Sequence, residues 1–354
     1  MGMSKKTFAD ANMLGAKLEH MEVYAFRNKD SFTLKSSSGG AFSEIVLEYM
    51  KDMPEKTAVY GASFDEQFNV VHTRITRFND MRMLRGSKYV QSGLGNSFSL
   101  IAEDLNLGIR VLFSGTPCQV NALNQYLSHK KCSTDGLMTV DVLCHGTPSP
   151  KLWTDYKNWL EKKYGSNIKE FSFRYKGDGN KRRMAYPMRV CFENGKVLED
   201  TFLLRLYMTL YFSQNAYRNT CYSCRFSNKN RCSDVTVGDF WKYEEVLGKK
   251  LLEPWKGMSL ILANTNKGVS LVRRIEESAL NSSEIYMERC DLKQFESVQF
   301  EFGATNERPA TSEKFQQDYH QYGIEFVLKR YAGYNVKGFV KHVFKKYLTK
   351  LGLK

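Results

Sequence analysis

Two hydrophobic periodicities alternate along this chain. Short apolar runs typical of buried strands occur at 23–26, 58–62, 70–75, 110–113, 137–143 and 258–263. Longer repeats with helical spacing occur after residue 40 and at 97–107, 118–128, 150–164, 201–213, 267–280 and 312–331. Strands that alternate with helices predict an α/β fold, with an open, mostly parallel sheet whose ligands gather at the carboxyl ends of strands.

Residues 168–200 follow a different pattern. Phe171, Phe173 and Tyr175 alternate with polar residues, and Asn194-Gly195 is a typical two-residue hairpin turn. This segment predicts an antiparallel hairpin region. The fold class is therefore α/β with some α+β character, built on an open mixed sheet with flanking helices.

The last twenty residues predict an amphipathic helix. Its apolar face carries Val336, Phe339, Val340, Val343, Phe344, Tyr347, Leu348 and Leu351. Its other face carries Lys337, Lys341, Lys345, Lys346, Lys350 and Lys354. We expect the apolar face to pack against the body or a partner, with peripheral attachment to a membrane surface as the alternative.

Composition narrows the class of protein. The chain has 354 residues, 42% of them apolar, which is enough for a large globular core. Residues 1–22 lack the apolar stretch of a signal peptide, and 202–212 is too short to span a membrane, so we expect a cytoplasmic protein. The net charge of +14 favours anionic cofactors or acidic partners, and we expect no nucleic acid because no nucleic-acid motif is present.

The cysteines suggest a metal or cluster site. Cys221, Cys224 and Cys232 fall within twelve residues, directly before a strand-like run. Cys118 and Cys144 each follow a predicted buried strand, so loops at strand ends could bring several thiolates together. Thiolates select zinc or iron-sulfur clusters, although a buried free cysteine is the ordinary alternative for each position.

Two glycine-containing loops are candidates for binding phosphate. Ser37, Ser38, Gly39 and Gly40 precede a helix, where free backbone amides attract anions, but a serine that merely caps the helix explains the segment equally well. The loop 86–95 holds two glycines in G-x-G spacing without the third glycine of a dinucleotide fingerprint. Its Lys88 and Tyr89 suit contact with a phosphate or a ring, and an ordinary surface loop is the alternative.

Five motifs in order give the chain a family resemblance. They are Ser36-Ser-Ser-Gly-Gly40, Lys88-Tyr-Val-Gln-Ser92, Ser114-Gly-Thr-Pro-Cys-Gln119, Cys144-His-Gly146 with Pro148, and Cys221-x-x-Cys224 leading into Asp234-Val-Thr-Val-Gly-Asp-Phe-Trp241. Over roughly residues 23–280 the chain resembles the beta subunits of coenzyme F420 hydrogenases and dehydrogenases, which include hydroxymethyl chlorophyll a reductase. The resemblance implies FAD, a 4Fe-4S cluster, and electron or hydride transfer to a second redox partner.

The resemblance also implies site residues. The cluster ligands would be Cys118, Cys144, Cys221 and Cys224, with Cys232 in reserve for Cys144. The flavin site would be lined by Ser37, Ser38, Gly39, Gly40, Lys88, Tyr89, Gln91, Ser92 and Thr116. No catalytic residue is assigned, and Asp239 and His145 would shape the surroundings of the cluster.

The expected organisation has four parts. They are a helical leader at 1–22, a flavin-binding part at 23–115, an iron-sulfur and flavin part at 116–280, and a helical C-terminal extension at 281–354. Many relatives carry an N-terminal ferredoxin module, whereas this chain has no cysteine before Cys118. We therefore expect an acidic ferredoxin-like partner and a small-molecule redox substrate, for which coenzyme F420 is a candidate.

Two other functions remain open at this stage. The C-x2-C pair would equally suit a non-redox binding protein stabilised by zinc. Alternatively, Cys118 at a helix start could act as a nucleophile with His145 as its base. The sequence does not distinguish the substrate, the direction of electron flow or the oligomeric state.

Overall fold

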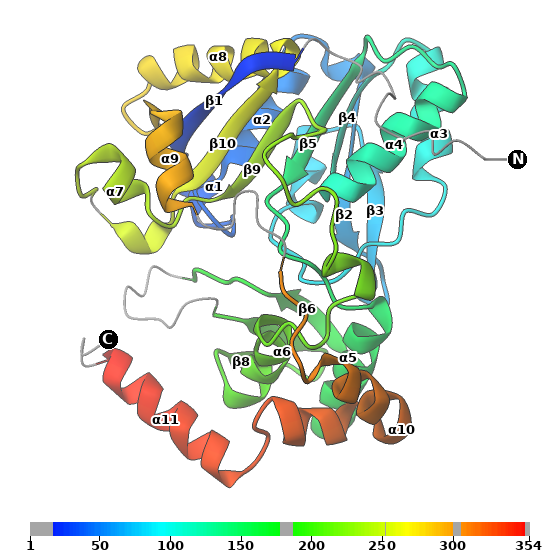
Figure 1. The fold of residues 1–354 in the computed structure, drawn as a ribbon, viewed down its shortest axis with the longest axis vertical. Helices are drawn as coiled ribbons and strands as arrows, with labels where there is room; N and C mark the ends of the chain where they lie inside the picture. The colour runs from blue at the N-terminus through cyan, green and yellow to red at the C-terminus, as the bar shows by residue number, and fades with distance from the viewer. Residues whose placement is uncertain (1–16, 178–186, 252, 300–305, 351–354) are drawn as a thin grey trace, which may run out of the picture.

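Two lobes, each with its own sheet, make up the structure, a computed structural model that describes residues 17–177, 187–251, 253–299 and 306–350. The larger lobe holds an eight-stranded sheet and the smaller lobe a three-stranded sheet (Figure 1). Among the described residues, no helix combines the length and apolar character needed to cross a bilayer.

The large sheet is mixed. Its strands lie in the order β11 (Tyr286–Cys290), β1 (Lys17–Arg27), β10 (Ser259–Thr265), β9 (Val235–Asp239), β5 (Leu137–Val142), β4 (Arg110–Gly115), β2 (Thr57–Phe64) and β3 (Val70–Ile75). The four central strands β9, β5, β4 and β2 run parallel, and the strands outside them are antiparallel to their neighbours. This confirms the predicted α/β class with an open mixed sheet.

Helices cover both faces of this sheet. Successive side chains of a strand point to opposite faces, and here both faces carry apolar side chains that must be covered. Val59 of β2 packs under α2 (Ala41–Lys51) and α8 (Asn266–Leu280), whereas Ala58 and Tyr60 pack under α3 (Ser97–Asn106) and α4 (Pro117–His129). The short helices α7 (Tyr243–Leu247) and α9 (Leu292–Val298) cover the second face near β1 and β10. A further short helix, α1 (Asp30–Thr33), precedes α2.

The smaller lobe is built around aromatic side chains. Its antiparallel strands β6 (Ile168–Ser172), β7 (Arg189–Phe192) and β8 (Val197–Glu199) confirm the predicted hairpin region. They pack with α5 (Pro150–Tyr164), α6 (Phe202–Phe212) and α10 (Ser312–Tyr331). Trp153 lies fully buried at the centre, and its indole Nε1 donates to the Phe68 carbonyl oxygen of the larger lobe at 2.6 Å, which ties the lobes together.

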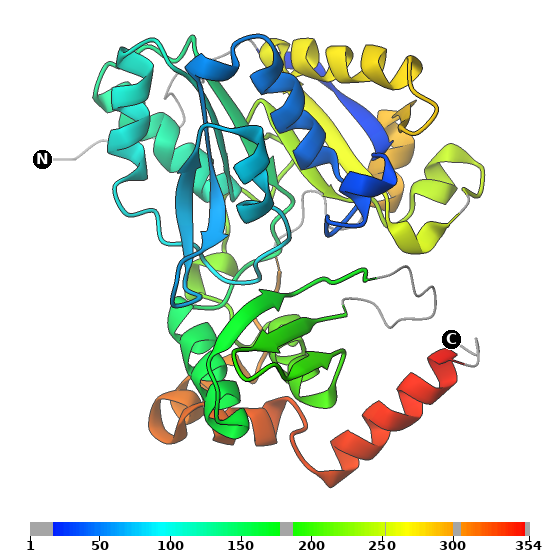
Figure 2. The ribbon, with the colours of Figure 1, turned by 180° about the vertical axis from the view of Figure 1, so that it is seen from behind.

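The chain crosses between the lobes more than once. It leaves the large sheet after β5, builds α5 to α6 in the smaller lobe, and returns to the sheet at β9. After β11 and α9 it enters the smaller lobe again as α10 and ends in α11 (Val336–Lys350) (Figures 1 and 2). Both segments that carry predicted cluster cysteines beyond β5 therefore lie at this crossing.

Three sequence expectations change. Residues 17–22, expected in a helical leader, belong to strand β1, and the rest of that leader lies outside the described residues. Strand β11 falls within the C-terminal region that was expected to be helical. The apolar face of α11 was expected to pack against the body or a partner, and within this chain six of its large apolar side chains are exposed, so the body does not cover it.

Gly39 marks the closest approach between the loop before α2 and the sheet. A Cβ atom at this position would lie 2.3 Å from the Phe26 carbonyl oxygen and 2.6 Å from the Ser259 backbone nitrogen. Both neighbours are backbone atoms of adjacent strands, so neither can move aside without distorting the sheet. Only glycine fits this position.

We expect Gly39→Ala to lower the free energy of unfolding by about 1–3 kcal/mol, because it overpacks a rigid site. Urea unfolding followed by far-ultraviolet circular dichroism measures this effect. Gly136→Ala is the matched control, since its Cβ would meet Leu105 Cδ2 at an ordinary 3.5 Å. Equal stability of the two variants would contradict the proposed close approach.

Candidate functional site at the junction of the lobes

The outgoing and returning segments are paired at the crossing between the lobes. Pro148 and Tyr217 form an antiparallel bridge, and the Arg218 backbone nitrogen donates to the Thr147 carbonyl oxygen at 3.1 Å. The Tyr217 ring packs on Gly146 so closely that a Cβ there would lie 2.5 Å from it. This pairing brings the Cys144 loop beside the Cys221 turn.

The pKa of the Cys144 thiol is influenced by all three other predicted ligands. Burial raises the pKa of Cys144 to about 12, while a hydrogen bond with the Gly146 backbone opposes the shift. The charges of three further thiols raise this pKa as well, namely those of Cys118, Cys221 and Cys224. Charges interact this way only at short range, so the four predicted ligands share one neighbourhood.

The surroundings of Cys221 agree with this grouping. Burial raises the pKa of its thiol, and a hydrogen bond with the Thr147 backbone lowers it. The charge of Cys224 raises this pKa further, and Cys118 contributes in the same direction. The backbone of the outgoing segment, at Gly146 and Thr147, therefore forms hydrogen bonds with the thiols of both segments.

Helix α4 presents Cys118 to this neighbourhood. Thr116 and Gln119 form a capping box at the start of the helix, with the Gln119 Oε1 atom accepting from the Thr116 backbone nitrogen at 3.0 Å. The Thr116 Oγ1 atom lies 3.1 Å from the Cys118 sulfur. Cys118 is exposed, so its sulfur is available at the junction.

Cys232 lies in a different environment. Its thiol donates to the Pro117 carbonyl oxygen at 3.2 Å, and burial together with the charge of Asp141 raises its pKa to about 12. The charge of Cys118 also raises the pKa of Cys232, so the two thiols are neighbours.

A single metal ion and a cluster place different demands on the thiols. Within the described ranges, no group of three or more His, Cys, Asp or Glu side chains is placed to hold one metal ion. A single zinc would need sulfur atoms about 2.3 Å from one point. In a 4Fe-4S cluster each thiolate binds a different iron. Assays for iron, sulfide and zinc distinguish the two.

The predicted flavin loops lie next to one another. The Ser37 hydroxyl accepts from the Ser87 backbone nitrogen at 2.7 Å, which joins the loop before α2 to the loop of Lys88. The Gln119 side chain donates to the Ser92 hydroxyl at 3.0 Å, which joins that loop in turn to the helix of Cys118. Gln91 lies between Lys88 and Ser92 on the same loop.

The two glycines of the first loop have reasons of their own within the fold. The sheet leaves no room for a side chain at Gly39. Gly40 adopts a left-handed backbone conformation, with φ 88°, at the start of α2. Ser38 donates through its hydroxyl to the Met258 carbonyl oxygen at 2.8 Å. The phosphate cradle at these residues therefore remains a prediction.

Lys88 is engaged with backbone carbonyls. Its ammonium donates to the carbonyl oxygens of Met83, Leu84 and Arg85 at 3.3, 3.2 and 2.9 Å. Burial lowers its pKa to about 7, while the three carbonyls stabilise the charged form. The neighbouring Tyr89 ring lies against Tyr211, with centroids 4.8 Å apart.

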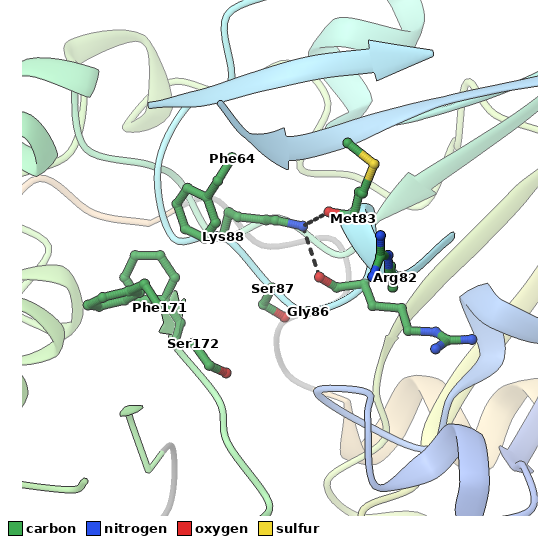
Figure 3. Close-up of a pocket in the computed structure, with 10 residues that line it drawn as sticks. Phe64, Arg82, Met83, Gly86, Ser87, Lys88, Phe171 and Ser172 are labelled. Atoms are coloured by element: carbon green, nitrogen blue, oxygen red, sulfur yellow. Dashed lines mark hydrogen bonds between the residues drawn. The ribbon is translucent and has the colours of Figure 1, made fainter. Parts of the chain in front are cut away.

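A cavity of about 240 Å³ lies beside Lys88. Figure 3 shows Lys88 and Phe64 on one side of it and Phe171 with Ser172 from the smaller lobe on another. Arg82 and Arg85 add two cations to the wall. Sequence reasoning missed both arginines, although they stand six and three residues before the Lys88 that it identified.

Two basic residues of the hairpin region, Arg174 and Lys176, bind other parts of the protein. Arg174 forms an ion pair with Asp239 of β9 at 2.5 Å, in which both side chains are largely buried. The Lys176 ammonium donates to the carbonyl oxygens of Thr33 at 2.9 Å and of Ser38. Lys176 therefore holds the smaller lobe against the predicted flavin loop, whereas Lys181, Arg182 and Arg183 lie outside the described residues.

Tyr211 connects the two halves of the site. Its hydroxyl donates to the Gly146 carbonyl oxygen at 3.2 Å, next to Cys144, and its ring packs on Tyr89. The charges of both Cys144 and Tyr89 influence its pKa, which burial raises well above the usual range. The thiol group and the Lys88 loop are thus separated by one side chain.

Comparison with known proteins identifies the family of the chain. The family described as the C terminus of the coenzyme F420 hydrogenase/dehydrogenase beta subunit matches residues 108–287, just over half of the chain. The chain belongs to this family. The matched residues 108–287 contain all four predicted cluster cysteines and the excursion from β5 into the smaller lobe and back to β9.

A solved structure shares the fold of this family member. The chain is similar to a chain of the F420-reducing NiFe hydrogenase complex from Methanosarcina barkeri, with a TM-score of 0.50 and 16% sequence identity. The similarity covers 90% of this chain and 92% of that one. No curated protein matches the sequence. As a member of the F420 hydrogenase/dehydrogenase beta family, the chain is a redox protein of the oxidoreductase kind.

Proposed function

We propose that the chain is an FAD- and iron-sulfur-dependent oxidoreductase that passes electrons between a ferredoxin-like partner and a soluble small-molecule substrate. Coenzyme F420 is the first substrate to test, because the matching family is named for it. The observation that supports the proposal best is the pairing of the two segments at the junction of the lobes, which brings the Cys144 loop beside the Cys221 turn.

Cys118, Cys144, Cys221 and Cys224 would hold a 4Fe-4S cluster. Burial raises the pKa of Cys144 and of Cys221, while hydrogen bonds with the Gly146 and Thr147 backbone oppose this shift and so stabilise the thiolate forms that ligate iron. The positive charge of Arg218 also opposes the shift of Cys221. The Pro148–Tyr217 bridge pairs the two segments that carry these thiols.

FAD would bind along the Ser37, Lys88 and Ser92 loops, and its bound ring would exchange electron pairs with a substrate and single electrons with a cluster. Arg82 and Arg85 suit its phosphates, and the phenylalanine rings of the cavity suit a flat ring system. The cavity is smaller than the roughly 300–1,000 Å³ of pockets that take a whole ligand. It would therefore receive only a part of FAD.

The proposed function draws on several of the predicted segments, and the flavin site is not confined to one of them. Segment 23–115 would supply most flavin contacts and segment 116–280 the cluster ligands, while 281–354 would form the extension. Smaller-lobe residues such as Phe171 also line the cavity. A basic protein with thiol ligands suits the reducing cytoplasm and an acidic electron donor.

We expect single serine substitutions at Cys118, Cys144, Cys221 and Cys224 each to lower bound iron and acid-labile sulfide in anaerobically purified protein. Each change removes a thiolate that the cluster requires. Cys132→Ser is the matched control, because Cys132 is partly exposed and lies outside the thiol group. Iron, sulfide and zinc assays together with an absorbance spectrum measure the outcome.

Two results would contradict this ligand set. Iron content that survives Cys144→Ser but not Cys232→Ser would make Cys232 the fourth ligand. Colourless wild-type protein with one zinc per chain would support the zinc-stabilised binding protein instead.

We expect Arg82→Glu to raise the dissociation constant for FAD roughly tenfold or more, which corresponds to about 1.4 kcal/mol. The substitution puts a negative charge on the cavity wall that we assign to FAD phosphates. Titration of flavin-free protein with FAD, followed by fluorescence, measures the constant. Lys130→Glu makes the same change at an exposed position outside the cavity lining and should leave the affinity unchanged. Equal affinities of wild type and Arg82→Glu would move the flavin to another surface.

We expect reduction by an acidic ferredoxin to slow steeply as salt rises, because exposed charges are screened over about 8 Å at physiological ionic strength. Arg182→Glu and Arg183→Glu should slow it at low salt, because they reverse two charges of the basic run Lys181-Arg182-Arg183, while Lys130→Glu should not. Stopped-flow absorbance measures the rate. A rate that is independent of salt would exclude electrostatic docking of the donor.

A further inference from the structure

Helix α11 attaches to the smaller lobe through a narrow side. Phe339 and His342 contact the Phe202 ring, each with centroids 5.7 Å apart, and the Lys346 ammonium donates to the Asp200 carbonyl oxygen at 3.2 Å. Gly338, His342 and Lys346, spaced four residues apart, are partly buried and mark the side that faces the body. Figures 1 and 2 show α11 along the outer edge of this lobe.

The apolar side of α11 points away from the protein. Its large side chains are exposed as follows: Val336 80%, Phe339 52%, Val340 59%, Val343 48%, Phe344 62% and Tyr347 59%. An amphipathic helix of a globular protein normally turns this side to the core. A contiguous exposed apolar surface of this kind marks an interaction site.

The charge beside this surface has one sign. Lys337, Lys341 and Lys345 are exposed on α11. The sequence contains no aspartate or glutamate from Phe326 to its end at Lys354. The apolar stripe is therefore flanked by lysines, in a segment that contains no acidic residue.

We propose that α11 binds the surface of an anionic lipid bilayer. Helices that lie in the membrane interface combine a lysine-rich side with exposed aromatic and aliphatic side chains. The valine and phenylalanine side chains would enter the boundary of the acyl chains. The lysine stems would extend so that their ammonium groups reach lipid phosphates.

Charge complementarity favours an anionic bilayer over a second copy of the chain as the partner of α11. Two α11 helices that paired through their apolar sides would bring two lysine-rich segments together, and each chain carries a net charge of +14. An anionic bilayer instead offers negative charge over the whole length of the helix. The inference does not depend on FAD, the cluster or their ligands.

Sedimentation of the full chain with vesicles tests the proposal. We expect binding to phosphatidylcholine vesicles that contain phosphatidylglycerol, weaker binding at high salt, and little binding to phosphatidylcholine alone. Val340→Asp combined with Phe344→Asp should weaken binding more than about tenfold, because it removes two large side chains from the buried side. Neither residue is among those of α11 that contact the body.

Leu107→Asp combined with Leu280→Asp is the matched control. Both leucines are exposed, at 77% and 82%, and lie on the larger lobe rather than on α11. This variant should bind vesicles as the wild type does. Far-ultraviolet circular dichroism and thermal unfolding show whether both double variants remain folded.

A second measurement avoids charged substitutions. Tyr347→Trp places a fluorophore on the apolar side, and its emission, after subtraction of the parent spectrum, should shift to shorter wavelength when phosphatidylglycerol vesicles are added. The absence of both this shift and vesicle binding would overturn the proposal. So would equal losses in the two double variants, or a wild-type dimer that Val340→Asp with Phe344→Asp converts to a monomer while vesicle binding is absent.

Discussion

The short pairing of Pro148 with Tyr217 is the contact on which the candidate site depends. Two segments that are far apart in sequence meet there, one leaving the sheet after β5 and the other returning to β9. Gly146 adopts φ 111° and lies directly under the Tyr217 ring, so the pairing has no room for a larger residue. Because Cys144 stands just before this contact and Cys221 just after it, the pairing sets how close their thiols lie.

Buried charges hold the returning segment in register. Arg231 and Asp141 form an ion pair at 2.8 Å in which both side chains are almost fully buried. Loss of one partner from such a pair costs about 3–5 kcal/mol, since the other charge is left buried without compensation. Arg231 also donates to the Thr236 hydroxyl at 3.2 Å, which links the cysteine loop to β9. The loop that supplies Cys221 and Cys224 is thus anchored at its end as well as at its start.

The two proposals use different surfaces of one protein. The junction of the lobes gathers cations and aromatic rings around a small cavity, whereas α11 presents apolar side chains and lysines to the outside. Attachment to a bilayer would leave the junction free for an electron donor, because α11 contacts the smaller lobe through its own inner side.

Local sequence determined most elements of this protein. The central strands, α3 to α6, α8 and the hairpin region follow from apolar periodicity, which depends on neighbours within a few residues. The family could be inferred from motifs, because short spacings such as that between Cys221 and Cys224 can be read directly from the sequence. Only the tertiary structure decided that β9 to β11 return to the first sheet, that Arg82 and Arg85 face Phe171 across a cavity, and that the apolar side of α11 stays exposed. These features depend on packing between segments distant in sequence, and periodicity shows that a side is apolar without showing what covers it.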